Sequence, residues 1–190
     1  MPVLPALGAD ARLPVRRCVD GALSPLTSFV LTRGFHEHER AAVTALLREY
    51  EAALGVSLCF QGFDAEVSGL PGEYAPPRGA LFLARTTADG ELLGCVALRP
   101  APGSSSACEM KRMYVRPAAR GLGLGRTLAL IVMDEARRLG YARMCLDTLP
   151  SLHAAHALYR SLGFRETGAA GSDPMVLLFE RDLGMPHDDA

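Results

Sequence analysis

The sequence predicts a mixed α/β domain in which a sheet lies between helices. Short apolar segments bounded by turn residues are typical of strands, and longer segments with apolar residues three and four apart are typical of helices. Along the chain these segments follow the order strand, helices, three strands, helix, strand, helix, strands. Such an alternation describes a mixed α/β sandwich.

Length and composition favour one soluble domain. The 190 residues suffice for a core of their own, and 49 % apolar with 22 % charged residues is typical of a globular protein. No apolar run is long enough to span a bilayer, so no membrane association is expected. The net charge of −1 gives no general attraction to a phosphate backbone, so nucleic acid is not an expected partner.

The cysteines indicate a reducing compartment. They are odd in number, scattered and never spaced as C-x-x-C, which argues against a disulfide framework and against zinc. The first residues lack a basic segment before an apolar one, so no export signal is expected. We therefore expect a cytoplasmic protein without a metal. Cys108 and Cys145 fall in predicted strands without a neighbouring base, which favours structural thiols over nucleophiles.

The domain is expected to occupy residues 27–184. Residues 1–26 contain four prolines and no periodicity, which predicts a loose N-terminal extension; a tail packed on the domain is the alternative. Residues 185–190 are expected to form a C-terminal tail.

The first half of the domain is predicted to contain a strand, a firm helix, a weaker helix and an antiparallel hairpin. These elements are expected at residues 28–33, 36–54, 57–70, 80–86 and 91–100. The second half is predicted to contain a strand, a strong amphipathic helix, a strand, a helix and a final strand. These elements are expected at residues 107–115, 124–139, 142–147, 151–163 and 175–183.

The stretch R-G-L-G-L-G-R at residues 120–126 lies between a predicted strand and a predicted helix. The first amides of a helix have no internal partner and the helix dipole is positive there, so this loop can hold a phosphate. A tight turn is the plainer alternative. No lysine follows the glycines, which excludes a Walker loop, and Arg126 stands where a dinucleotide fingerprint needs its third glycine.

Two motifs in order resemble one known family. The segment M-Y-V-R-P-A-A-R-G-L-G-L-G-R and, further on, A-L-Y-R-S-L-G-F are similar to the acetyl-CoA core of the GNAT superfamily of N-acetyltransferases. The resemblance covers about residues 29–183 and is most specific over 109–164. It implies a mixed, mostly antiparallel sheet with splayed central parallel strands and helices on both faces.

The resemblance also assigns the residues that bind acetyl-CoA. The glycine loop matches the segment whose backbone amides hold the diphosphate, and the end of the preceding strand matches the segment whose backbone runs beside the pantetheine arm. The implied cofactor-binding residues are Met113, Tyr114, Val115, Arg120, Gly121, Leu122, Gly123, Leu124, Gly125 and Arg126. Core packing is an alternative role for the side chains of Met113 and Val115.

Two residues are candidates for proton transfer. Glu109 stands where some family members place a general base, which has a clear task because a primary amine is mostly protonated at neutral pH. A solvated glutamate paired with Lys111 or an arginine is the alternative. Tyr159 matches the tyrosine that commonly protonates the coenzyme A sulfur; a core tyrosine is the alternative. His153 and His156 are reserve bases.

The acceptor site is expected between the first helices. Phe60, Gln61 and Tyr74 are its candidate walls, and Phe63, Asp64 and Glu66 lie in the same segment. Leu152 departs from the family, because many members carry an asparagine there that contacts the cofactor.

The expected activity is transfer of an acetyl group from acetyl-CoA to a primary amine, on a small molecule or a peptide, directly within a ternary complex. The alternatives are a non-catalytic acyl-CoA sensor and, more remotely, a nicotinamide-dependent dehydrogenase. By analogy with such folds, a homodimer is possible.

Overall fold

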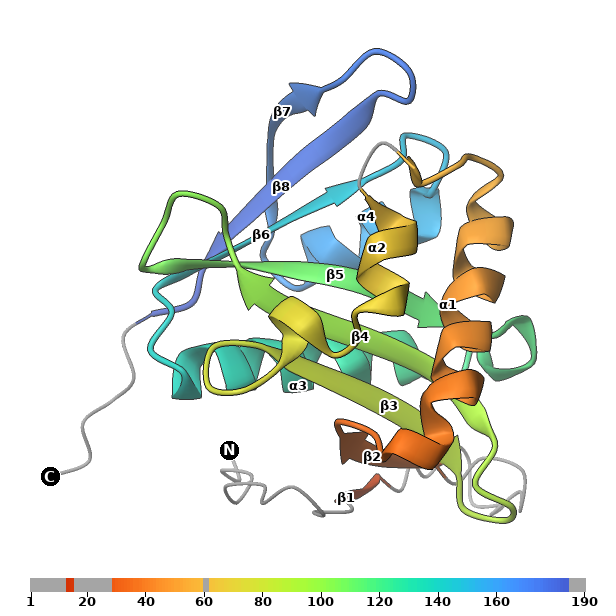
Figure 1. Cartoon of the computed structure of the whole chain (residues 1–190). Coiled ribbons are helices and arrows are strands. Elements are labelled where there is room, and N and C mark those ends of the chain that lie inside the picture. Colours follow the sequence, from red (N-terminus) through yellow and green to blue (C-terminus); the bar gives the residue numbers. More distant parts are fainter. Residues whose placement is uncertain (1–12, 16–28, 60–61, 185–190) are drawn as a thin grey trace, which may run out of the picture.

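The computed structural model describes residues 13–15, 29–59 and 62–184. Within them, eight strands form one sheet in the order β1-β2-β3-β4-β5-β6-β8-β7, and helices cover both faces (Figure 1). The neighbours β5 and β6 are parallel, whereas the other neighbouring pairs of this sheet are antiparallel. The predicted fold class, a mixed and mostly antiparallel sheet with helices on both faces, is confirmed.

The bounds of the elements follow. The strands are β1 (Leu13–Val15), β2 (Phe29–Arg33), β3 (Ala80–Thr86), β4 (Leu92–Pro100), β5 (Ala107–Val115), β6 (Arg143–Thr148), β7 (Arg165–Ala170) and β8 (Val176–Asp182). The α-helices are α1 (Arg40–Leu54), α2 (Phe63–Ser68), α3 (Leu124–Arg138) and α4 (His153–Ser161). Short 3-10 turns are η2 (Glu37–Glu39), η4 (Gly72–Tyr74) and η5 (Pro117–Ala119).

Two strands were not predicted. The strand β1 lies inside the segment expected to be an extension and pairs with β2, while the rest of residues 1–26 lies outside the described residues. The strand β7 pairs with β8 although its sequence, R-E-T-G-A-A, is exposed throughout. The weaker helix expected over 57–70 is shorter than predicted and corresponds to α2. This helix begins after Gly62, whose backbone is in the left-handed conformation.

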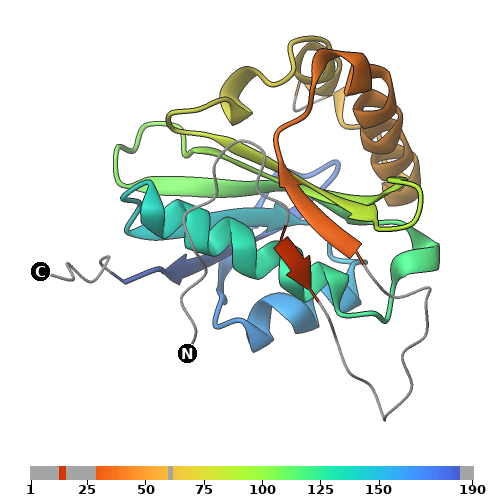
Figure 2. The same cartoon turned by 90° about the horizontal axis from the view of Figure 1, so that it is seen from below.

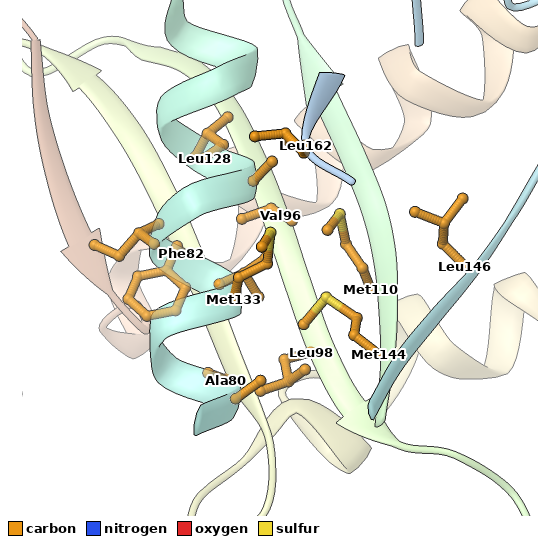
Figure 3. Packing of buried hydrophobic residues seen from close by; sticks show 14 of the residues in the cluster. Ala80, Phe82, Val96, Leu98, Met110, Leu128, Met133, Met144, Leu146 and Leu162 are labelled. Carbon is orange, nitrogen blue, oxygen red and sulfur yellow. The ribbon is translucent and has the colours of Figure 1, made fainter. Parts of the chain in front are cut away.

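The sheet separates two apolar clusters. Figure 2 shows α1 and α2 on one side of the sheet and α3 and α4 on the other. The cluster beneath α1 and α2 contains Val43, Leu46 and Leu47 of α1, spaced as a helix requires to present one face. The cluster on the opposite face packs α3 against the central strands, as Figure 3 shows for Leu128 and Met133. No helix of the described segments combines the length and apolar character needed to cross a membrane.

Candidate active site

The strands β5 and β6 separate partway along their length. They pair from Ala107 opposite Arg143 to Glu109 opposite Cys145. Beyond this point β5 continues beside β4, and β6 continues beside β8. The implied splay of the central parallel strands is therefore present, and it opens the sheet toward the carboxyl ends of both strands, where open α/β sheets bind ligands.

A bulge in β5 determines which side chains face each layer of helices. Cys95 of β4 pairs with Tyr114 and Ala97 pairs with Lys111, so Arg112 and Met113 together oppose one residue of β4. Arg112 has φ 54°, in the left-handed region. As a result, Lys111 and its neighbour Arg112 both face the α1 and α2 layer, and Met113 turns toward α3.

A cavity of about 70 Å³ lies where the two strands separate. Both faces of the sheet contribute to it, because the gap between β5 and β6 joins them. Its polar lining residues are Tyr50, Lys111, Arg112, Asp147, Thr148 and Tyr159. Met110, Met113, Leu54 and Leu152 are among its apolar lining residues.

Tyr159 reaches this cavity from α4. Its side chain is 7 % exposed, and its hydroxyl lies 3.9 Å from Sδ of Met113, which is a weak acceptor. Burial raises the pKa of Tyr159 above that of an ordinary tyrosine, and nearby Tyr50 and Asp147 raise it further. The phenol therefore stays protonated across the neutral range and is available as a proton donor.

Lys111 and Asp147 form an ion pair across the gap, with 2.5 Å between Nζ and Oδ1. Each lies two residues beyond the last paired position of its strand, on the same face as Glu109 and Cys145. Neither residue was predicted from the sequence to belong to the site. Both residues fall in predicted strands, but their pairing depends on the alignment of strands that are distant in sequence.

Arg112 is anchored to α2. Its Nε and NH2 donate to the two carboxylate oxygens of Glu66 at 2.7 and 2.6 Å, and its guanidinium lies 4.9 Å from the ring centre of Phe63. The hydroxyl of Tyr74 donates to the same carboxylate at 2.8 Å. Burial, followed by the charge of Glu66, raises the pKa of Tyr74.

The candidate acceptor walls are only partly placed. Tyr74 lies behind Glu66 and lines a separate cavity of about 290 Å³, together with Glu73 and Arg99. Phe60 and Gln61 lie outside the described residues.

The candidate bases lie outside the described lining of the cavity at Tyr159. Glu109 pairs with Arg99 across the β4–β5 hairpin, at 2.7 Å from Nε, and Arg99 also pairs with Glu73. His156 is buried with Nε2 2.9 Å from the carbonyl oxygen of Leu149, whereas His153 is exposed.

The glycine loop leads into the N-terminus of α3. Gly121 and Gly123 both have φ 77°, which a side chain would strain, and Gly123 is the N-cap residue of α3. No side chain caps this end of the helix, so its first amides are available to an anion. Arg120 donates to the carbonyl oxygen of Val115 at 3.1 Å, and Arg126 donates to Ser161 at 3.1 Å.

The remaining loop residues connect this helix end to the cavity. Gly125 lies in the first turn of α3, and a Cβ atom there would lie 3.6 Å from Cε of Met113 and 3.9 Å from Cγ2 of Val115. Leu124 is buried in the core, Leu122 is half-buried, and Tyr114 packs against Tyr50 with ring centres 5.9 Å apart. Residues predicted to bind one cofactor thus form a continuous path from the α3 N-terminus to Tyr159.

Comparisons with known proteins agree with this geometry. The model of the acetyltransferase (GNAT) family matches residues 42–164, more than half of the chain. An uncharacterized N-acetyltransferase of Schizosaccharomyces pombe is 44 % identical over 122 residues, covering 64 % of this chain and 74 % of that protein.

Solved structures share the fold. A GNAT acetyltransferase from Staphylococcus aureus superimposes with a TM-score of 0.69 at 15 % identity, covering 81 % of this chain and 99 % of the other. YncA from Salmonella typhimurium, solved with its cofactor acetyl-CoA, gives a TM-score of 0.60 at 21 % identity, with coverage of 84 % and 98 %.

The central parallel strands of this mixed sheet separate, and a glycine loop leads into the N-terminus of the neighbouring helix α3. This combination is typical of acyltransferases that use acyl-CoA. The chain belongs to the GNAT family of acetyltransferases, whose members use acetyl-CoA. It is therefore an acyltransferase, as its sequence predicted.

Proposed function

We propose that this protein transfers an acetyl group from acetyl-CoA to a primary amine, directly within a ternary complex and within a single domain over residues 27–184. The observation that carries the proposal is the buried Tyr159 side chain, which lines the cavity between the splayed strands. The acetyl-CoA found in YncA, which has the same fold, supports this cofactor.

The residues of the chain fit this co-substrate. The amides of the glycine loop and the first turn of α3 would hold the diphosphate, because Gly121 and Gly123 adopt a conformation that exposes the backbone. The backbone of Met113, Tyr114 and Val115 would lie beside the pantetheine arm. The buried hydroxyl of Thr148 has no hydrogen-bond partner among the described residues and lines the same cavity, where it is available to a polar group of the arm.

The reaction requires three proton movements. An ammonium loses one proton to become a nucleophile, and its nitrogen then bonds to the thioester carbonyl carbon. That nitrogen gives up a second proton to solvent. The C–S bond breaks, and the sulfur takes a proton to leave as a thiol. Tyr159 is the proposed donor of that proton, while a carboxylate accepts the proton of the ammonium.

Glu109 is proposed as that base, acting through water because it is not among the lining residues of the cavity and stands two residues before Lys111 on β5. We expect Glu109→Gln to lower kcat/KM by roughly 10²-fold and to shift the acid limb of its pH profile upward, since deprotonation of the amine then relies on solvent. Steady-state rates across the pH range measure this. Glu166→Gln, which removes an exposed partner of Arg160, is the matched control. An unaltered acid limb would contradict the role of Glu109 as a base and leave the ion pair with Arg99 as its role.

The activity itself is tested by release of free thiol from acetyl-CoA with a panel of amines, amino acids and peptides. We expect thiol release that depends on the acceptor and yields one acetylated product per thiol. Tight binding of acetyl-CoA without thiol release across the whole panel would contradict catalysis and favour a sensor. Absence of acetyl-CoA binding would contradict the proposed cofactor.

Substitution in the glycine loop should weaken cofactor binding. At Gly121, φ is +77° and no atom lies within 4 Å of an added Cβ, so alanine introduces backbone strain without a clash. We expect Gly121→Ala to lower stability by about 1–2 kcal/mol and also to reduce affinity for coenzyme A, because the loop amides move. Calorimetric titration with coenzyme A measures the second effect.

Gly140 provides the control. It has φ +82° and equal free space, but it follows the opposite end of α3. Gly140→Ala should lose similar stability and retain its affinity for coenzyme A. Equal affinity in the two variants would contradict a role of the loop in binding the diphosphate.

A cytoplasmic location is also proposed. The described cysteines, Cys59, Cys95, Cys108 and Cys145, are free thiols, which suits a reducing compartment. Burial raises the pKa of Cys95 to about 12, so this thiol is not a reactive nucleophile.

A further inference from the structure

We infer that the acceptor is an α-amino acid with a free carboxylate, whose ammonium is held by Asp147 and whose carboxylate is held by Lys111. This inference rests on the proposed acetyltransferase function and specifies its acceptor. It is carried by an ion pair at the point where the two central strands separate.

The position of the pair places it at the reacting end of the cavity. Lys111 and Asp147 each lie two residues beyond the last backbone pairing of β5 with β6, and both line the cavity that Tyr159 enters from the other face. Asp147 and Tyr159 line the same small cavity, so the carboxylate lies on the wall that the proposed proton donor also forms. An ammonium bound to Asp147 is therefore close to the group that protonates the leaving sulfur.

Stability alone does not explain this pair. Lys111 is 7 % exposed, and the cost of desolvating two charges offsets much of their attraction, so a buried ion pair is weak support for a fold. Apolar residues at both positions would bridge the strands as well. The charges therefore indicate a ligand that needs them.

Lys111 retains hydrogen-bonding capacity. An ammonium carries three N–H donors, and Asp147 is the partner that the described residues provide for Nζ. The neighbouring cation Arg112 is different, because Glu66 engages its guanidinium through two hydrogen bonds. Of the two cations at the cavity, Arg112 thus already has a two-point carboxylate partner, whereas Lys111 has a single-point contact with Asp147.

The choice of residue supports this assignment. Lys111 is the only lysine in a chain whose lysines and arginines total 20. An arginine suits a planar two-point contact with one carboxylate, whereas a lysine is a compact charge whose donors point in three directions. A lysine can therefore contact Asp147 and a second carboxylate together.

Charge balance separates the candidate acceptors. The pair contributes one positive and one negative charge, so a zwitterion enters without adding net charge. A polyamine would bring two or more positive charges to a single carboxylate beside a cation. A peptide terminus or a simple amine would supply the ammonium but no second carboxylate for the remaining donors of Lys111.

The test uses the full-length protein saturated with coenzyme A, so that binding is measured without turnover. The single lysine can be labelled biosynthetically with ¹³C at its ε-carbon, which yields one lysine side-chain NMR signal. The twenty amino acids are screened first. L-leucine, L-leucinamide and 3-methylbutylamine are then compared, with the corresponding derivatives of any amino acid that binds better, and with putrescine.

We expect at least one amino acid to shift the Lys111 signal and to bind about 10- to 100-fold more tightly than its carboxamide and its decarboxylated amine. Lys111→Met should remove this preference while Lys111→Arg keeps part of it. Arg165→Met, at an exposed site, should keep all of it.

Two results would overturn the inference: amines or carboxamides that bind as tightly as the amino acids, or a Lys111 signal that no amino acid shifts. Thiol release from simple amines in the same protein would then leave the acetyltransferase function intact. Conversely, amino-acid binding without thiol release would contradict the transferase function and retain the amino-acid site. The wild-type titration needs no variant to fold, so the outcome does not depend on Lys111→Met.

Discussion

Arg112→Met is expected to lower the free energy of unfolding by about 3–5 kcal/mol, because removing one partner leaves the other charge buried and unpaired. The Arg112 side chain is 2 % exposed and donates two hydrogen bonds to Glu66. Without it, Glu66 keeps the hydroxyl of Tyr74 but no longer has this cation. Urea unfolding followed by circular dichroism measures the loss.

A double variant distinguishes the effect of an unpaired buried charge on stability from the effect of disrupted packing. Replacing both partners, as in Arg112→Met with Glu66→Leu, should recover part of the lost stability, since no charge is then left buried. Arg165→Met removes an exposed pair with Asp182 at 3.5 Å and should change stability by less than about 0.5 kcal/mol. If Arg112→Met behaves like Arg165→Met, the pair does not hold α2 against β5.

The same pair gives a pH dependence of stability. Burial raises the pKa of Glu66, but the hydrogen bonds and charge of Arg112, with the Tyr74 hydroxyl, outweigh it and leave the pKa below the ordinary 4.5. A carboxylate with a lowered folded-state pKa adds stability above its unfolded pKa and loses it as the pH falls through the folded value. Wild-type stability should therefore fall more steeply than that of Glu66→Gln on acidification below about pH 4.

The pair also explains how the bulge persists. Arg112 adopts φ 54°, which is unfavourable for a residue with a side chain. Its contacts with Glu66 and Phe63 of α2 fix the side chain on that face, and the backbone must turn to allow them. Because the bulge directs Met113 toward Tyr159, an interaction on the α2 side of the sheet shapes the opposite side, which α4 covers.

This bulge marks the limit of what the sequence could predict. Regular alternation in E-M-K-R-M-Y-V places Lys111 and Arg112 on opposite faces, whereas the extra residue places both beside α1 and α2. No turn residue or glycine signals the change. The ion pair of Lys111 with Asp147 lies before the bulge and depends on the parallel register of β5 with β6, which no local pattern encodes.

Elements with strong periodicity were predicted well. The helix expected over 124–139 is α3, because its apolar stripe and glycine boundaries are local signals. The strand β7 was missed for the opposite reason: its R-E-T-G-A-A sequence has no apolar face, and backbone pairing with β8 alone makes it a strand. The partner of Glu109 was left open between Lys111 and an arginine, and the hairpin register places Arg99 opposite it.

Tyr159 could be predicted as a site residue because its motif is local. The surroundings of its side chain could not be predicted from the sequence. Helical spacing indicated a side chain facing inward, and the position of α4 against β8 puts its ring 6.1 Å from that of Phe179. The cavity beyond the ring arises from the gap between two strands that are distant in sequence. The sequence therefore predicted Tyr159 as the proton donor without Asp147, the carboxylate that lines the same cavity.

Tyr159→Phe is expected to lower kcat by about 10²–10⁴-fold while changing affinity for coenzyme A little, because the hydroxyl is proposed to act on the leaving sulfur. Stability should fall by less than about 1 kcal/mol, since the hydroxyl contacts only the weak acceptor Sδ of Met113 among the described residues. Thiol-release kinetics, with calorimetric titration of coenzyme A, separate the two quantities.

Tyr141→Phe is the matched control. Tyr141 is also buried, but its hydroxyl donates to the carbonyl oxygen of Arg78 at 2.8 Å, away from the described lining of the cavity. Loss of this hydrogen bond in Tyr141→Phe should lower the free energy of unfolding by about 1 kcal/mol and leave kcat unchanged. The opposite pattern, a normal kcat in Tyr159→Phe, would reduce Tyr159 to a packing residue.

The pH profile provides a second readout for the same residue. Burial raises the pKa of Tyr159 first, and Tyr50 and Asp147 add to it, so the acid form persists beyond the ordinary range of tyrosine near pH 10. Wild-type kcat should therefore show no decline from ionisation of this phenol below about pH 10. A fluorinated tyrosine at this position, which is more acidic, should bring such a decline to lower pH. If the profile does not respond to fluorination, the proton of the leaving thiol comes from another group.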